Sequence, residues 1–248
     1  MKNRSLTLGL FALFFSSFFL TETTFAQCPA NSLALTPAPL EEPWAIEWWM
    51  PRHHEKINEE GREKAEILLI GDSITHGWEN SGKEVWSDTF GSYPTYNIGY
   101  SGDRTENVLW RFEHGEIDGI NPKVAVLMIG TNNTGHRQDP AECTAEGIRQ
   151  IVYRINENLP DTQLLLLAIF PRGETPDHEL RILNEEINSR IQPLGDLDRV
   201  TFMNLNNLFL TDEGILTEEI MPDMLHPNET GYRIWADALH PVLLELLD

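Results

Sequence analysis

Five short apolar segments recur along the chain, and each is followed by a longer stretch in which apolar and polar positions are mixed. The third and fourth segments are apolar at every position, which is typical of strands buried on both faces of a parallel sheet. Strands that alternate with helices predict a sheet covered by helices on two sides. The predicted strands are Glu66–Gly71, Thr95–Gly99, Val124–Ile129, Leu164–Ile169 and Val200–Asn204.

The stretches between these strands predict helices of different lengths. Val108 and Phe112, for example, fall on one side of a helix. Trp44 and Trp48 also share a helical face, but Pro51 predicts the end of any helix begun there. We therefore expect a five-stranded parallel sheet with helices on both faces, which is a three-layer α/β/α sandwich. The predicted helices are Arg52–Glu63, a short one around Trp86 and Phe90, Arg104–His114, Pro140–Leu159, His178–Ile191 and Glu229–Leu247.

The first 26 residues have the pattern of a secretory signal peptide. Lys2 and Arg4 precede an apolar run over Leu6–Leu20, and small residues stand near Ala26, where we expect cleavage. This run is short for a membrane span, and no later segment approaches the roughly 20 apolar residues that a spanning helix needs. The sequence therefore predicts export to the periplasm or the exterior, without deciding between them.

Three segments divide the chain: the signal peptide at 1–26, a lead-in rich in Pro and Ala at 27–42, which we expect to be loose, and one domain at 43–248. No Gly/Ser-rich linker or internal repeat divides that domain. Gln27 ahead of Cys28 does not fit the small residue expected before a lipidated cysteine. In an oxidising compartment Cys28 and Cys143 can form a disulfide, but their spacing fits two unpaired thiols equally well.

Acidic residues outnumber basic ones by 39 to 18, and without residues 1–26 the count is 38 to 16, a net charge of −22. This charge argues against nucleic acid as a partner and against stable association with an anionic membrane. The sequence has no Cys/His cluster with the spacing of a structural metal site. His53 and His54 are adjacent and point to different faces of a helix, and His136 stands apart, so we expect no metal and no cofactor.

Small polar residues follow the first three predicted strands: Gly71-Asp72-Ser73, Gly99 to Asp103, and Gly130 to Asn133. In a doubly wound sheet these strand ends line one crevice. Near the end of the chain, Asp223 stands three residues before His226. An aspartate so placed can accept the Nδ1 proton of the histidine and leave Nε2 facing a hydroxyl, as an activated serine requires. Ser73 is therefore the candidate nucleophile.

These motifs, in this order, resemble the four conserved blocks of the SGNH/GDSL hydrolase superfamily: Gly71-Asp72-Ser73, Gly102, Gly130-Thr131-Asn132, and Asp223 with His226. Further segments resemble the catalytic subunits of intracellular platelet-activating-factor acetylhydrolase and their secreted bacterial relatives. They are Ser101-Gly102-Asp103, Val108-Leu109-Trp110-Arg111, Gly130-Thr131-Asn132-Asn133, Pro171-Arg172-Gly173 and Leu225-His226. The resemblance covers roughly Trp48 to Leu247, and it implies a flavodoxin-like strand order for the five-stranded parallel sheet of the α/β/α sandwich.

The resemblance implies Ser73 as nucleophile, His226 as general base and then acid, and Asp223 as the residue that orients His226. It also implies an oxyanion hole formed by the backbone N–H groups of Ser73 and Gly102 and by the side-chain amide of Asn132. A glycine lets a backbone N–H approach the substrate closely, and a neutral carboxamide can donate to an oxyanion. Asn133 departs from the aspartate that many members carry, which leaves open how its loop is supported.

Three other residues are candidates to line the substrate site. Arg104 and Arg172 lie beside the predicted crevice and either bind a substrate anion or form salt bridges. Trp78 follows Ser73 closely and is the tryptophan we expect to line the site. We expect the remaining tryptophans, Trp44 and Trp48 among them, to pack in the core and at its rim and not to form a platform for a sugar.

The sequence thus predicts an exported serine esterase that hydrolyses short-acyl esters, above all acetyl esters of carbohydrates or small molecules, through an acyl-enzyme. A lipid or lysophospholipid esterase is the alternative within the same class, and a non-catalytic carbohydrate-binding surface protein is the alternative outside it. A glycosidase would need a placed pair of carboxylates, which the sequence does not offer. The oligomeric state stays open, with a dimer among the possibilities.

Overall fold

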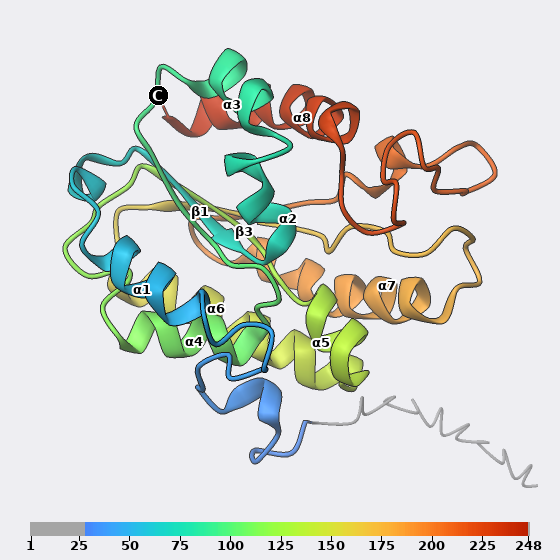
Figure 1. Cartoon of the computed structure of the whole chain (residues 1–248), viewed down its shortest axis with the longest axis horizontal. Helices are drawn as coiled ribbons and strands as arrows, with labels where there is room; N and C mark the ends of the chain where they lie inside the picture. Colours follow the sequence, from blue (N-terminus) through green and yellow to red (C-terminus); the bar gives the residue numbers. More distant parts are fainter. Residues whose placement is uncertain (1–27, 248) are drawn as a thin grey trace, which may run out of the picture.

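The computed structural model describes residues 28–247, so the predicted signal peptide lies outside the described residues. Five parallel strands form one sheet in the order β2-β1-β3-β4-β5, which confirms the flavodoxin-like topology (Figure 1). The strands are β1 (Ile67–Gly71), β2 (Thr95–Gly99), β3 (Val124–Met128), β4 (Gln163–Leu167) and β5 (Val200–Met203).

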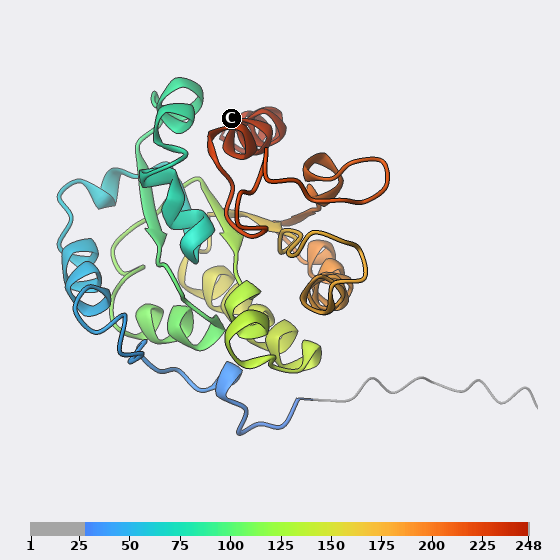
Figure 2. The same ribbon diagram turned by 45° about the vertical axis from the view of Figure 1, so that its right-hand side comes forward.

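Helices cover both faces of this sheet, as the two views show (Figures 1 and 2). Successive residues of β1 alternate between two apolar cores: Leu68 and Ile70 pack into one, and Ile67 and Leu69 into the other. The first core is closed by α1 (Trp49–Ile57), α4 (Thr105–Glu113), α6 (Ala141–Asn158) and α7 (Glu179–Ile191). The second is closed by α3 (Lys83–Phe90) and α8 (Glu229–Leu247).

The ends of β1, β2 and β3 lie at one level of the sheet. Gly71 of β1 pairs with Gly99 of β2 on one side and with Met128 of β3 on the other. The segments that follow these strands therefore leave the sheet next to one another. This register brings three sequence-distant loops to the same edge, as predicted.

Helix α1 differs from the prediction, because it begins at Trp49 and ends at Ile57. Pro51 does not end the helix but lies in its first turn, where a backbone N–H would have no intrahelical acceptor in any case. The early start places Trp49 in the core, fully buried.

Two short helices were not predicted, and both begin at the candidate site. They are α2 (Ser73–His76) and α5 (Thr131–Arg137). Their sequences are dominated by small and polar residues and have no helical period of apolar residues, so the sequence predicts turns there. Asp72 caps α2, since its Oδ1 accepts the N–H of Ile74 at 3.0 Å.

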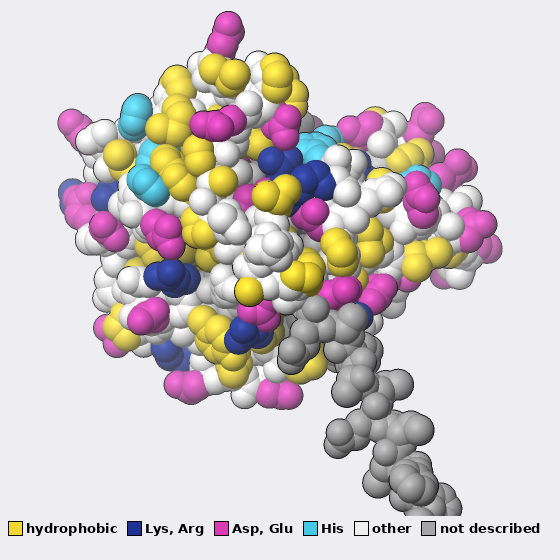
Figure 3. Space-filling view, turned by 90° about the horizontal axis from the view of Figure 1, so that it is seen from below, with side chains coloured by type: hydrophobic (Ala, Val, Ile, Leu, Met, Phe, Trp, Pro, Cys, Tyr) yellow, Lys and Arg dark blue, Asp and Glu magenta, His cyan; other side chains and the backbone are white. Residues whose placement is uncertain are grey.

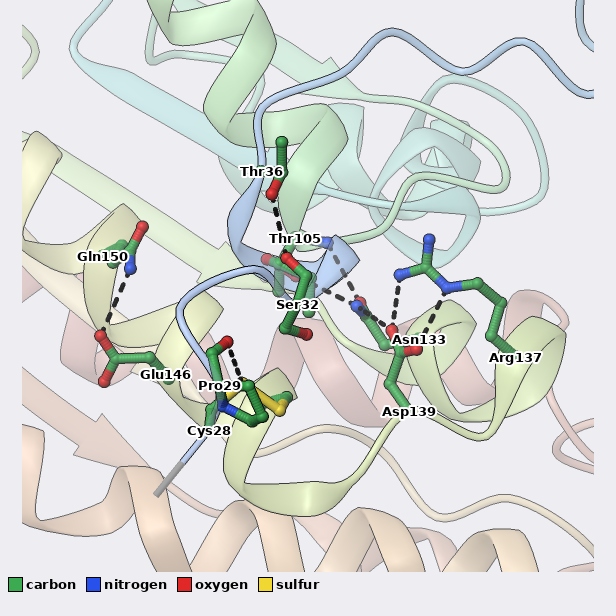
Figure 4. Close-up of a disulfide and its surroundings, with 12 residues drawn as sticks. Cys28, Pro29, Ser32, Thr36, Thr105, Asn133, Arg137, Asp139, Glu146 and Gln150 are labelled. Carbon is green, nitrogen blue, oxygen red and sulfur yellow. Dashed lines mark hydrogen bonds and ion pairs between the residues drawn. A yellow bond between two sulfur atoms is a disulfide. The ribbon is translucent and has the colours of Figure 1, made fainter.

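The lead-in before the domain is packed, not loose. Cys28 forms a disulfide with Cys143 of α6, which decides the question that the spacing left open (Figure 4). The carbonyl of Ala34 accepts a hydrogen bond from Thr105 Oγ1 at 2.8 Å. Leu40 is buried in the first core. Residues 28–42 thus form part of the folded domain.

The face shown in Figure 3 carries acidic side chains spread around it and only small groups of basic ones. Within residues 28–247, every helix is too short or too polar to cross a bilayer.

Candidate active site

Ser73, His226 and Asp223 form one chain of contacts. Ser73 Oγ lies 2.8 Å from His226 Nε2, and His226 Nδ1 lies 2.6 Å from Asp223 Oδ2. Ser73 is the first residue of α2, whereas the other two come from the loop before α8. The structure therefore brings together three residues separated by up to 153 positions in the order that a serine nucleophile, its base and an orienting carboxylate require.

Hydrogen bonds within the segment fix the conformation of Asp223–His226. Asp223 Oδ1 accepts the backbone N–H of His226 at 2.7 Å and that of Leu225 at 3.1 Å, while Met224 takes a left-handed backbone conformation with φ 58°. Burial raises the pKa of Asp223, but the hydrogen bonds from His226 outweigh it and the pKa lies below its usual value. Asp223 is therefore ionised at neutral pH and can stabilise a protonated His226.

The turn from β1 into α2 leaves no room for side chains at its start. A Cβ on Gly71 would lie 2.4 Å from the carbonyl oxygen of Met128 and 2.1 Å from Thr75 Oγ1, so only glycine fits there. Asp72 follows, with 1% of its surface exposed. Burial raises the pKa of Asp72 from its ordinary 3.8 to about 6, although the Ile74 N–H and the charges of His226 and Arg172 favour ionisation.

Asp72 should make the stability of this protein depend on pH. The pKa of Asp72 is higher in the folded protein than in the unfolded chain. The protonated Asp72 carboxyl therefore stabilises the folded state in full below pH 3.8, and this stabilisation is lost as the pH rises through about 6. The shift corresponds to about 3 kcal/mol. We expect Asp72→Asn, which keeps the Oδ1 acceptor, to gain stability relative to the wild type by about that amount between roughly pH 4 and 7.5.

Urea unfolding of both proteins across this pH range measures the difference. Asp198→Asn is the matched control, because the Asp198 side chain is 97% exposed. The expectation would be contradicted if the difference in unfolding free energy between the wild type and Asp72→Asn did not change with pH.

Gly102 and Ser73 carry the two candidate backbone donors. Gly102 has φ +83°, and a Cβ there would lie 2.1 Å from the ring of Trp44. Both facts require glycine at this position. Ser73 is the first helical residue of α2, where a backbone N–H has no acceptor within the helix.

Asn132 supplies the third candidate donor. Its side chain is almost fully buried, and Nδ2 donates to the carbonyl of Asp103 at 3.0 Å. A primary amide has two donor hydrogens, so this bond fixes the orientation of the carboxamide and leaves one hydrogen for a ligand. Because Asp103 directly follows Gly102, the same turn positions two of the three candidate oxyanion donors.

A buried ionic cluster supports that turn, and sequence reasoning did not find it. Asp103 accepts hydrogen bonds from Arg111 Nε at 2.9 Å and from Trp49 Nε1 at 2.6 Å. Arg111 also contacts Glu116, and all three charged side chains are fully buried. Burial raises the pKa of Glu116, but the Arg111 guanidinium, His53 and Tyr100 together hold it below its usual range. The only signal in the sequence is that three charged residues lie in a segment with apolar neighbours.

Asn133 itself supports the loop in which it lies. This answers the question that its departure from the family's aspartate left open. Its Oδ1 accepts the N–H of Thr105 at 3.0 Å, and its Nδ2 donates to Thr105 Oγ1 and to Asp139 Oδ2, each at 3.0 Å. These contacts join α5 to the start of α4 beside the packed lead-in (Figure 4). An amide thus serves here as both acceptor and donor.

The structure places the three candidate lining residues differently from one another. Trp78 does not line the site: it is buried between Trp86, Tyr232 and Trp235, with ring centroids 5.0, 4.5 and 4.8 Å away. The prediction was wrong because closeness in sequence to Ser73 says nothing about the side to which α2 and the following turn direct the ring.

Arg104 is nearly buried and pairs with Glu106 at 2.8 Å and with Glu42 at 3.2 Å, which fits a structural salt bridge. Arg172 Nη1 donates to the carbonyl of Thr131 at 2.8 Å, next to Asn132. Its charge acts on both Asp72 and Asp223. Arg172 therefore lies at the site, whereas Arg104 is neutralised by carboxylates.

Among residues 28–247, no three His, Cys, Asp or Glu side chains gather in a way that could hold a metal ion. A cavity of about 660 Å³ lies beside the disulfide and includes none of the residues named for the site. The arrangement of a serine, a histidine and an aspartate in one chain of contacts instead suits acyl transfer.

Comparison with known proteins agrees with this chemistry. Residues 69–234 match the model of the GDSL-like Lipase/Acylhydrolase family. Platelet-activating factor acetylhydrolase IB subunit alpha1 from Homo sapiens is 34% identical over 215 residues, which cover 86% of this chain and 90% of that protein. The alpha2 subunit from Rattus norvegicus is 32% identical over 224 residues, which cover 90% and 95%.

Solved structures share the fold. A GDSL-like lipase from Bacteroides thetaiotaomicron aligns with a TM-score of 0.66 and 19% identity, over 79% of this chain and 97% of that one. An acetylxylan esterase from Geobacillus stearothermophilus aligns with a TM-score of 0.59 and 17% identity, over 75% and 96%. At these identities the likeness concerns the fold alone.

Proposed function

Because the chain belongs to the GDSL-like lipase/acylhydrolase family and is a carboxylic ester hydrolase, we propose that it is an exported serine esterase that removes acetyl groups from carbohydrates. The observation that carries the proposal is the contact chain from Ser73 Oγ through His226 to Asp223, at 2.8 and 2.6 Å. We propose that the Gly102 N–H and the Asn132 amide act with this chain of contacts as oxyanion donors.

In the first half of the reaction, Ser73 Oγ attacks the ester carbonyl carbon while His226 Nε2 accepts the hydroxyl proton. The carbonyl oxygen becomes an oxyanion, which the N–H groups of Ser73 and Gly102 and the Asn132 amide stabilise. Asp223 stabilises the imidazolium. Collapse of the intermediate breaks the bond to the alcohol oxygen, which takes the proton from His226, and leaves an acetyl group on Ser73.

In the second half, a water molecule attacks the acyl carbon and gives its proton to His226. The second tetrahedral intermediate uses the same three donors. When it collapses, the Ser73 oxygen leaves and recovers the proton from His226, and acetate is released.

Two observations favour a soluble acetylated substrate over a membrane lipid. The mature chain carries a net charge of −22, which an anionic bilayer repels. The relatives and fold neighbours include an acetylhydrolase and an acetylxylan esterase by name. A pocket shaped for an acetyl group rejects longer chains by steric overlap.

Export is supported by the disulfide between Cys28 and Cys143, since such bonds persist in oxidising compartments. Cys28 follows the predicted cleavage site by two residues, so the disulfide would fasten the new N-terminus to α6.

The proposed specificity predicts that kcat/KM falls as the acyl chain lengthens. Measured with acetyl, butyryl and octanoyl esters of one alcohol, kcat/KM should drop by at least tenfold from acetyl to octanoyl. Acetylated xylo-oligosaccharide should be hydrolysed faster than acyl groups in phospholipid vesicles. Faster turnover of the octanoyl ester or of the vesicles would favour the lipid or lysophospholipid esterase instead.

A further inference from the structure

Four aromatic side chains, Trp44, Trp48, His76 and His136, lie around the rim of the site, and we call them the aromatic rim. Trp44 is 51% exposed, which is unusual for a tryptophan in a domain that buries most of its large apolar side chains. It lies in the segment before α1, whereas His76 ends α2 and His136 belongs to α5. The rim therefore spans both helices that begin at the site.

The aromatic rim directly adjoins Gly102, one of the proposed oxyanion donors. The Trp44 ring is so close to Gly102 that an added Cβ would lie 2.1 Å from its Cη2 atom. The His136 ring lies across the edge of Trp44, with centroids 6.0 Å apart and planes at 76°. A substrate whose carbonyl oxygen is bound at Gly102 would therefore extend past Trp44 on one of its sides.

The rings are held in place by contacts among themselves. Trp44 and Trp48 are stacked with centroids 6.4 Å apart and planes at 28°, and Trp48 Nε1 donates to the Trp44 carbonyl at 3.2 Å. Trp48 in turn lies 6.4 Å from the ring of His76, whose Nδ1 is 3.1 Å from Ser101 Oγ. A ring fixed in this way loses little side-chain entropy when a ligand binds.

Both histidines of the rim are neutral at neutral pH. Burial and the charge of Arg52 lower the pKa of His76 to about 4. Burial and the charges of Arg104 and Arg172 likewise lower the pKa of His136. The rim therefore offers uncharged aromatic surface. Charged side chains near it are paired with each other: Glu42 with Arg104, and Glu79, 3.7 Å from His76, with Arg52.

We propose that the aromatic rim, centred on Trp44, binds a sugar ring of the acetylated carbohydrate next to the acetyl group that is removed. The proposal rests on the proposed function, because it assigns the carbohydrate a place at the same site. A pyranose presents a flat face of C–H groups to an aromatic ring and a ring of hydroxyls to polar neighbours. Here Trp44 offers the ring, and Ser101 and the 41%-exposed Glu42 offer polar partners. A long acyl chain would instead need an enclosed apolar channel, which an exposed ring flanked by an ion pair does not form.

Kinetics of Trp44→Ala with two acetate esters test the proposal. We expect the ratio of kcat/KM for acetylated xylo-oligosaccharide to that for ethyl acetate to fall by roughly tenfold or more, through KM for the sugar, because lost stacking of this kind is worth about one factor of ten. Trp44→Phe keeps an aromatic face and should recover most of the ratio. Leu208→Ala, at a side chain that is 52% exposed in the segment after β5, is the control for loss of exposed apolar surface.

A binding measurement separates failure of this inference from failure of the proposed function. Ser73→Ala is titrated calorimetrically with xylo-oligosaccharide that carries no acetyl group, and again with Trp44→Ala added. Binding that depends on Trp44 supports the rim whatever ester the enzyme hydrolyses. If the xylo-oligosaccharide does not bind, the sugar-binding role of the rim is overturned. It is also overturned if Trp44→Ala changes neither the binding nor the kcat/KM ratio. Both conclusions hold even where the wild type deacetylates carbohydrates.

Discussion

Replacing Ser73 with alanine should abolish ester hydrolysis, lowering kcat by about 10⁶-fold. The reason is that His226 Nε2, 2.8 Å from Ser73 Oγ, has no other nucleophile to activate in the first half of the reaction. The three oxyanion donors remain, so the residual rate should exceed that of the uncatalysed reaction. Initial rates on a chromogenic acetate ester, measured with active-site titration by a serine-directed phosphonate, give the loss.

The Ser73→Ala protein should fold like the wild type, because a hydroxyl that faces the crevice contributes little to packing. Thermal unfolding and circular dichroism check this. Ser189→Ala is a matched control, since Ser189 is an exposed serine on α7 whose Oγ only donates to the carbonyl of Glu185. More than a few per cent of wild-type activity in pure, folded Ser73→Ala would remove Ser73 from the mechanism.

Asn132→Ala should lower kcat by roughly 10²–10³-fold, with a smaller effect on KM. Its carboxamide is oriented by the bond to the Asp103 carbonyl before substrate arrives, so it stabilises the developing oxyanion without having to reorganise. The donor serves the tetrahedral intermediate more than the bound ester. Steady-state kinetics on one acetate ester separate kcat from KM.

Asn158→Ala is the control for this substitution, because Asn158 is exposed at the end of α6 and its side chain only donates to the Arg154 carbonyl. An effect of Asn132→Ala confined to KM would mean that Asn132 binds substrate without stabilising the intermediate. Equal losses in the control would point to general destabilisation.

Segments with strong local signals were predictable from the sequence. The strand Val124–Met128 is buried at every position, and the continuous apolar run reports that burial directly. The contact between Asp223 and His226 was also predictable, because a separation of three residues lets one turn join them. A parallel sheet with helices on both faces was predictable from the alternation of strands and helices.

Other features depend on contacts between distant segments. Trp44 lies against Gly102, and Asn132 is oriented by Asp103, although each pair is far apart in sequence. The ring of Trp78 turns into the core, away from Ser73, because α8 covers that side of the sheet. No local pattern encodes these directions.

The sequence by itself determined the sheet, its helical layers and the residues at the strand ends, because hydrophobic period and turn chemistry act over a few residues. Only the tertiary structure decided that Cys28 pairs with Cys143 and that Arg111 lies buried between Asp103 and Glu116. A disulfide needs two sulfurs brought within bonding distance, and a buried charge needs its partner supplied by the surrounding fold. Both conditions depend on how distant segments pack against one another, and no local pattern in the sequence predicts that packing.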